Sequence, residues 1–385
     1  MKKSEKENYL TILKLLFEFV DEQPVSKITL DFKKIELRKL LSFFDNHLLS
    51  CLLSLFFEKN PSYSGQFNER LIEKLADRKK IFLLRKNIFC ERLGKIIKIF
   101  QLNGIEYLNI KGPILEELIY KYPAIRSFGD LDFLVKEPAL LKLKKILINS
   151  GYENYSIRFQ KAVGSKLGLT TYEKLKREIN FIKTRKDSVI IDVHWRVLPN
   201  YSCSDQITFE LFENLKEFIY NGESIMIPGN YIYFNYLLLN AFKHRYYNIL
   251  YFYDLVLFRK KYLPDDKKLS KYLKKYNLLT QFKFILFIWN KIFDYKDPVF
   301  LKYSNNIFER KIFNQALSNI LNKKFYPQNP IFYLLLSPTF RDKIKLIKSR
   351  LLPDYYDLIA HFGRNKKIDR TKYYFEKLCK IKNIF

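Results

Sequence analysis

Apolar residues repeat at helical spacing along the first hundred positions of the chain. In the stretches 37–59 and 68–101 they recur at i, i+3, i+4 and i+7 with charged residues between them, which predicts amphipathic helices. The intervening NPSYSGQ (60–66) is rich in turn-forming residues and predicts a loop. Because 68–101 is long for one helix without caps, we expect a break within it.

The spacing changes at Gly104. Short β-branched or aromatic runs predict strands, and apolar residues three to four positions apart predict short helices between them. The expected strands are 105–110, 130–135 and 188–197, and the expected helices are 114–122 and 138–152. Pro113 suits the first turn of the earlier helix, and Gly151 suits the end of the later one. Asn221-Gly222 between two apolar runs predicts a β-hairpin over 217–228.

Beyond Pro228 the helical spacing returns and continues to the last residue. The pattern predicts an α+β protein that is mostly helical overall. We expect three parts: an N-terminal helical region (1–100), a small core of strands and helices (101–228) and a C-terminal helical region (229–385).

The composition is that of a folded protein. Hydrophobic residues make up 48% of the chain and aromatic residues 17%, which excludes a disordered protein. The four cysteines form no CxxC pair, so we expect a reducing compartment and neither a zinc site nor a disulfide framework. Apolar stretches such as 231–242 are broken well before the ~20 residues of a membrane span, and the first twenty residues favour an amphipathic helix over a signal peptide. We therefore expect a cytoplasmic protein without a transmembrane segment.

The formal net charge of +29 has two explanations, and the sequence leaves both open. A basic surface attracts polyanions such as RNA, so a non-catalytic basic binding protein is one alternative. However, lysine outnumbers arginine, and Lys, Ile, Asn, Phe and Tyr are abundant together, as an AT-rich coding sequence would produce. Under either explanation we expect weak, non-specific and salt-sensitive binding to nucleic acid.

Carboxylates stand out in two of the expected strands. Side chains alternate across a strand, so Asp130 and Asp132 share one face, and Asp192, His194 and Arg196 share one face of 188–197. If the two strands are neighbours, three carboxylates gather at one place and repel one another unless a cation is present.

A divalent ion such as Mg²⁺ or Mn²⁺ resolves this repulsion, and a pair of ions about 3.5–4 Å apart can activate a hydroxyl and stabilise a leaving group. The alternative is structural, because an Asp-x-Asp pair alone is as common in surface strands as in metal sites. Lys111-Gly112, at the end of the preceding strand, adds a turn that phosphate can approach.

These residues resemble those of a known family. The IKGP turn (110–113), Arg126 before GDLDFLV, a SGY ending at Tyr152 and the later IDVHWRV resemble the uncharacterised nucleotidyltransferase family of the polymerase-β-like superfamily. A helix resembling the family's next motif carries His244 and Asp254. The resemblance covers roughly residues 80–260.

The resemblance implies a mixed sheet flanked by helices, and metal-dependent transfer of a nucleoside monophosphate from an NTP to an acceptor, with release of pyrophosphate. It implies that Asp130, Asp132 and Asp192 are the catalytic, metal-binding triad. The chain departs from the superfamily at Gly112-Pro113, where proline offers no N–H to a phosphate. We therefore expect the remaining residues of the donor site to be Lys111, Gly112, Arg126, Ser127 and His194.

Several roles stay open. Arg126 either binds the triphosphate or neutralises the aspartates, and His194 either contacts substrate or metal ligands or makes structural hydrogen bonds. The sequence does not choose among a small molecule, a sugar, a peptide or protein side chain and an RNA end as acceptor, although the resemblance slightly favours an acceptor other than RNA. A metal-dependent nuclease is a further alternative, but no acidic-x-Lys pair follows Asp130 or Asp132.

Overall fold

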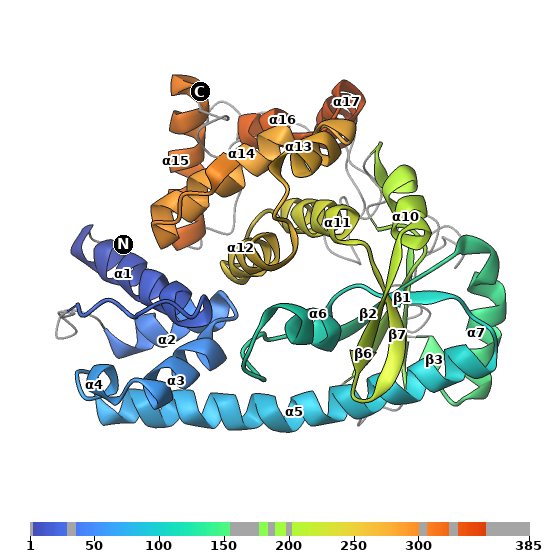
Figure 1. Cartoon of the computed structure of the whole chain (residues 1–385), viewed down its shortest axis with the longest axis horizontal. Coiled ribbons are helices and arrows are strands. Elements are labelled where there is room, and N and C mark those ends of the chain that lie inside the picture. Colours follow the sequence, from blue (N-terminus) through green and yellow to red (C-terminus); the bar gives the residue numbers. More distant parts are fainter. Residues whose placement is uncertain are drawn as a thin grey trace, which may run out of the picture.

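The computed structural model describes residues 3–28, 36–154, 177–183, 189–197, 202–299, 306–322 and 330–351 (Figure 1). The N-terminal helices are α1 (Lys3–Val20), α2 (Leu37–Asn46), α3 (Ser50–Lys59), α4 (Pro61–Ser64) and α5 (Glu69–Leu102). The middle of the chain forms β1 (Tyr107–Asn109), α6 (Gly112–Ile119), β2 (Asp130–Val135), η2 (Glu137–Ala139), α7 (Leu140–Asn149), β3 (Glu153–Asn154), β4 (Glu178–Ile182), β5 (Ile190–His194), α10 (Ser204–Glu213), β6 (Leu215–Tyr220) and β7 (Glu223–Pro228).

The described C-terminal residues are helical, and the expected helical continuation over 352–385 lies outside the described residues. The C-terminal elements are α11 (Asn230–Lys243), α12 (Leu250–Tyr262), α13 (Asp266–Lys275), α14 (Leu279–Ile288), η3 (Trp289–Phe293), α15 (Ile307–Asn322), α16 (Pro330–Leu336) and α17 (Phe340–Leu351). Helices dominate the described residues, and the prediction of a mostly helical α+β protein is confirmed.

A mixed five-stranded sheet holds the residues of interest. Its strand order is β1-β2-β5-β4-β3, in which β2 and β5 are parallel and the other pairs are antiparallel. The three expected strands are present, whereas β3 and β4 were not predicted. A separate two-stranded sheet is the predicted hairpin of β6 and β7, and Asn221 (φ 49°) and Gly222 (φ 81°) form its turn.

One face of the large sheet is apolar. Phe133, Val193 and Ile179 lie in register on β2, β5 and β4, and all three are fully buried. Phe100, in the last turns of α5, packs edge-on against Phe133 with ring centroids 5.1 Å apart. The opposite face carries Asp132 and Asp192.

The break that we expected within 68–101 is wrong, because α5 continues for 34 residues (Figure 1). Asn68 caps its N-terminus by accepting a hydrogen bond from the N–H of Arg70. Buried residues recur along its whole length, from Leu71 to Phe100, because the helix packs first against α3 and then against the sheet. This continuous packing stabilises α5 along its whole length, so the helix does not break in its middle.

The stretch 37–59, in contrast, is divided. α2 ends at Asn46 and α3 begins at Ser50, with Leu48 at φ 60° between them, and the two axes are bent by 114°. Among the described residues no single helix is long and apolar enough to cross a membrane, and only this bent pair reaches that length and composition together.

Helices α6 and α11 lie close to the polar face of the sheet. α6 begins at Gly112, directly after β1, and packs against β2. The hydroxyl of Tyr233 in α11 donates a hydrogen bond of 2.9 Å to the carbonyl of Ile110. This bond fixes α11 to the turn between β1 and α6.

Candidate active site

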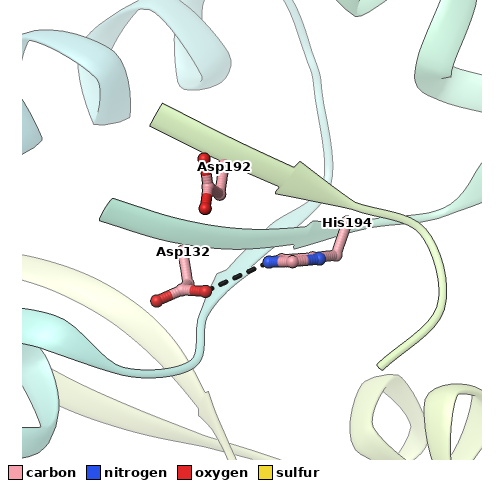
Figure 2. Close-up of side chains that lie close together, drawn as sticks. All are labelled: Asp132, Asp192 and His194. Carbon is pink, nitrogen blue, oxygen red and sulfur yellow. Dashed lines mark hydrogen bonds and ion pairs between the residues drawn. The ribbon is translucent and has the colours of Figure 1, made fainter. Parts of the chain in front are cut away.

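The centre of the site is a row of side chains across three neighbouring strands. Asp132 of β2 lies in register with Asp192 of β5, which lies in register with Asn180 of β4. Partners in register project from the same face of a sheet, so both carboxylates are on the polar face (Figure 2). Asn180 donates a hydrogen bond of 2.5 Å from Nδ2 to Oδ1 of Asp192.

His194, at the end of β5, contacts the carboxylates of Asp132 and Glu178. Its Nε2 lies 3.0 Å from Oδ1 of Asp132, as the dashed line in Figure 2 shows. Its Nδ1 lies 3.5 Å from Oε2 of Glu178 on β4. Asp132, Asp192 and His194 each offer one ligand atom, and these atoms all lie within 4.8 Å of one another.

Lys111 adds a positive charge on the same side. Its Nζ lies 2.7 Å from Oδ1 of Asp132, with both side chains largely buried. The lysine stands in extended backbone immediately before α6, so the turn after β1 points it at β2. Burial alone would lower the pKa of Lys111, but Asp132 raises it well above its usual value, and the lysine is therefore charged.

The three aspartates differ in charge state. Burial would raise the pKa of Asp132, but Lys111 and His194 outweigh it and hold this pKa well below its usual range. The charge on Asp132 and partial burial then raise the pKa of Asp130 to about 7. Burial and the same charge raise the pKa of Asp192 to about 6. Asp132 is therefore ionised, whereas Asp130 and Asp192 retain their protons to a higher pH than usual.

Asp130 lies at the edge of the cluster. It lies two residues before Asp132 on the same strand and is half-buried. Its carboxylate oxygens do not belong to the group of ligand atoms formed by Asp132, Asp192 and His194. Gly112 lies beside it, because a Cβ on Gly112 would stand 3.6 Å from the carbonyl oxygen of Asp130. With φ at 63°, Gly112 adopts a backbone conformation that side chains disfavour.

Two of the expected donor-site residues have other contacts. Arg126 is buried, and its Nε and Nη2 lie 3.1–3.2 Å from the carboxylate of Asp254 in α12, and not against the strand aspartates. The hydroxyl of Ser127 lies 4.0 Å from the sulfur of Cys51 in α3. Contacts of either residue with a donor phosphate therefore stay predictions.

His244 and Arg196 are the two remaining polar candidates. His244, which follows α11, is an exposed residue. Partial burial of its ring and the charge of Lys111 lower its pKa to about 4. Its ring lies 5.8 Å from that of Tyr251. Arg196 lies beyond the end of β5, where its Nε contacts Asp205 at 2.9 Å.

Sequence reasoning missed Glu178 and Asn180. Both belong to EINFI (178–182), whose alternation of polar and apolar residues is the signal that could have revealed β4. β4 brings Glu178 and Asn180 to the site because it pairs with β5, and the local sequence does not specify this pairing.

Comparison with known proteins supports the resemblance noted above. The sequence profile of a family described as "Uncharacterised nucleotidyltransferase" matches residues 34–294, which is more than half of the chain. The chain belongs to this family. No curated protein and no solved structure matches it significantly. The matched range contains the whole five-stranded sheet and both helices that lie near its polar face.

The residues at this place fit a divalent cation. Oδ2 of Asp132 is buried and has no hydrogen-bond partner among the described residues, which is costly for a carboxylate oxygen. Two carboxylates and one imidazole each offer one ligand atom, and these atoms lie close enough together to share one ion. These ligand atoms therefore suit a metal ion, and membership of the family indicates a nucleotide substrate.

Proposed function

We propose that this chain is a metal-dependent nucleotidyltransferase that transfers a nucleoside monophosphate from an NTP to an acceptor hydroxyl or similar group. Asp132 and Asp192, on parallel strands in register, hold a divalent ion such as Mg²⁺ or Mn²⁺, and Asp130 completes the charge needed for a second one. The observation that carries the proposal is the unpartnered, buried Oδ2 of Asp132 beside Asp192.

The bond changes follow from the products. The acceptor oxygen forms a bond to the α-phosphorus of the NTP, the bond from that phosphorus to the bridging oxygen breaks, and pyrophosphate leaves with the electron pair. The acceptor hydroxyl loses its proton in the same step. A bound divalent ion supplies positive charge that polarises the phosphoryl oxygens and favours the deprotonated acceptor.

The chain's own residues have distinct tasks. Asp192, whose pKa is raised to about 6, is placed to accept or orient the proton of the acceptor hydroxyl. Asn180 holds Oδ1 of Asp192 and so fixes the direction of this carboxylate. Lys111 provides a point charge at the start of α6, within reach of phosphates that approach Gly112.

Arg126 acts indirectly in this proposal. Its ion pair with Asp254 joins the segment before β2 to α12, and Glu116 of α6 accepts hydrogen bonds from the N–H groups of Ile125 and Arg126. These contacts fix the approach of the chain to Asp130 and Asp132. Arg126 is therefore a positioning residue, and Lys111 is the residue that binds the donor.

The test is transfer of label from NTP. The full chain is incubated with each α-³²P-labelled NTP, Mg²⁺ or Mn²⁺ and cell extract, and labelled macromolecules and small molecules are separated. We expect one NTP to label an acceptor, with release of pyrophosphate. Asp192→Asn is the matched control, because an asparagine oxygen can still accept the bond from Asn180 while the charge is lost. No label transfer from any NTP with either ion would contradict the proposal.

A further inference from the structure

We propose that His194 is itself a ligand of the metal ion, and that Glu178 orients it, so that this centre binds first-row transition ions in preference to Mg²⁺. This inference rests on the proposed metal dependence but assigns a different ligand set. The resemblance implies three aspartates, whereas the geometry points to Asp132, Asp192 and an imidazole nitrogen.

The spacing of the ligand atoms supports a shared ion. Two atoms that lie about 2.1 Å from one ion at a right angle are about 3.0 Å apart. A hydrogen bond joins Nε2 of His194 and Oδ1 of Asp132 at this same separation, 3.0 Å, so an ion can take the place of the hydrogen between them. The Asp192 carboxylate completes a group within 4.8 Å, so a modest contraction brings all three around one ion.

Glu178 sets the orientation of the ring. An ionised carboxylate only accepts hydrogen bonds, so a hydrogen on Nδ1 of His194, which lies 3.5 Å from Oε2 of Glu178, would face a carboxylate there. Nε2 then faces Asp132 and offers its lone pair when an ion takes the place of its hydrogen. A histidine that binds a metal almost always donates its other ring N–H to a carboxylate, a backbone carbonyl or a water.

The surroundings of His194 and Asp132 hold both side chains in place. The side chains of His194 and Asp132 are 9% and 3% exposed, and strand pairing fixes both backbones. Lys111 also contacts this Oδ1 of Asp132, while the buried Oδ2 of the same carboxylate has no hydrogen-bond partner among the described residues and remains available to an ion.

The ligand chemistry predicts the selectivity. Mg²⁺ takes oxygen ligands and retains several waters, whereas imidazole nitrogen suits first-row transition ions. A site with two carboxylates and one imidazole should therefore bind Mn²⁺ at least about tenfold more tightly than Mg²⁺.

The experiment uses Mn²⁺ as the probe and the full chain without a histidine tag. Electron paramagnetic resonance gives the affinity for Mn²⁺, competition gives that for Mg²⁺, and electron spin echo envelope modulation detects nitrogen bonded to Mn²⁺. The chain has only four histidines, at 47, 194, 244 and 361. We expect a nitrogen signal that His194→Gln removes together with the preference for Mn²⁺.

Two further variants separate the roles. His244→Gln is the matched control, and it should leave the nitrogen signal unchanged. Glu178→Ala retains the ligand but loses its support, so the affinity for Mn²⁺ should fall by about 10–100-fold while a nitrogen signal persists at saturating ion.

A wild-type spectrum without a nitrogen signal would overturn the inference, and so would equal affinities for the two ions. If His194→Gln does not fold, a nitrogen signal that His244→Gln retains supports the inference, and its absence from the wild type overturns it. Transfer from NTP with Mg²⁺ and no nitrogen signal refutes this ligand assignment but supports the proposed function. A nitrogen signal without transfer from any NTP supports the assignment and refutes only the function.

Discussion

Replacement of Arg126 by alanine should lower the stability of the folded protein, and this loss should be its main effect rather than weaker binding of the nucleotide. The guanidinium and the Asp254 carboxylate are 6% and 4% exposed, and the hydroxyl of Tyr120 donates a further bond of 2.9 Å to the same carboxylate. Burial raises the pKa of Asp254, whereas the guanidinium and the Tyr120 hydroxyl oppose this rise, and the arginine retains its proton.

The magnitude follows from the burial of the pair. Removal of one partner of a buried ion pair leaves an uncompensated charge and costs about 3–5 kcal/mol. Arg126→Ala should therefore lower the free energy of unfolding by about this amount. Replacement of both partners, Arg126→Met with Asp254→Leu, removes both charges and should recover most of the loss.

Urea denaturation followed by circular dichroism gives the free energy of unfolding, and steady-state kinetics gives KM for the NTP on the same preparations. Arg196→Ala is the control, because Arg196 pairs with Asp205 at the surface and its loss should cost less than about 1 kcal/mol. If Arg126→Ala left stability within about 1 kcal/mol of wild type and raised KM instead, Arg126 would be a donor-binding residue and the argument from burial would be wrong.

Three further outcomes are expected. Lys111→Ala should raise KM for the NTP more than it lowers kcat, as initial rates across NTP concentrations would reveal; unchanged values of both would place the phosphates elsewhere. The raised pKa values of Asp130 (about 7) and Asp192 (about 6) mean that the folded, metal-free protein holds protons that the unfolded chain loses near pH 4. Their contribution to stability is thus complete below about pH 4 and is lost as the pH rises through about 7. In EDTA, melting temperatures of wild type should fall over this interval more steeply than those of Asp192→Asn, and parallel curves would refute the coupling. The charge of +29 should give RNA binding that weakens steeply with salt in filter-binding titrations, and no binding at low salt would leave coding bias as its explanation.

The pairing of the carboxylate strands was accessible from sequence because both strands carry local signals. DLDFLV and IIDVH alternate carboxylates with buried apolar residues, and the structure pairs Asp132 directly with Asp192. The helical flanks and the Asn221-Gly222 turn likewise depend on neighbours in the chain.

The other features depend on residues distant in sequence. Arg126 and Asp254 are 128 positions apart, so nothing near Arg126 indicated that its charge was already paired. Glu178 reaches His194 only because β4 pairs with β5. The length of α5 was mispredicted for the same reason, since contacts with α3 and the sheet stabilise the helix along its length.

The parallel pairing of β2 and β5 also bears on how long the native molecule lasts. Asp132 and His194 are 62 positions apart, and parallel strands pair only after a long connection has closed. Such non-local contacts form slowly, so we expect the site to assemble late in folding. Interactions absent from the folding transition state slow unfolding and leave the folding rate nearly unchanged. An ion at these carboxylates would therefore prolong the life of molecules that have already folded, and in a cell the loaded form would outlast the empty one under proteolysis.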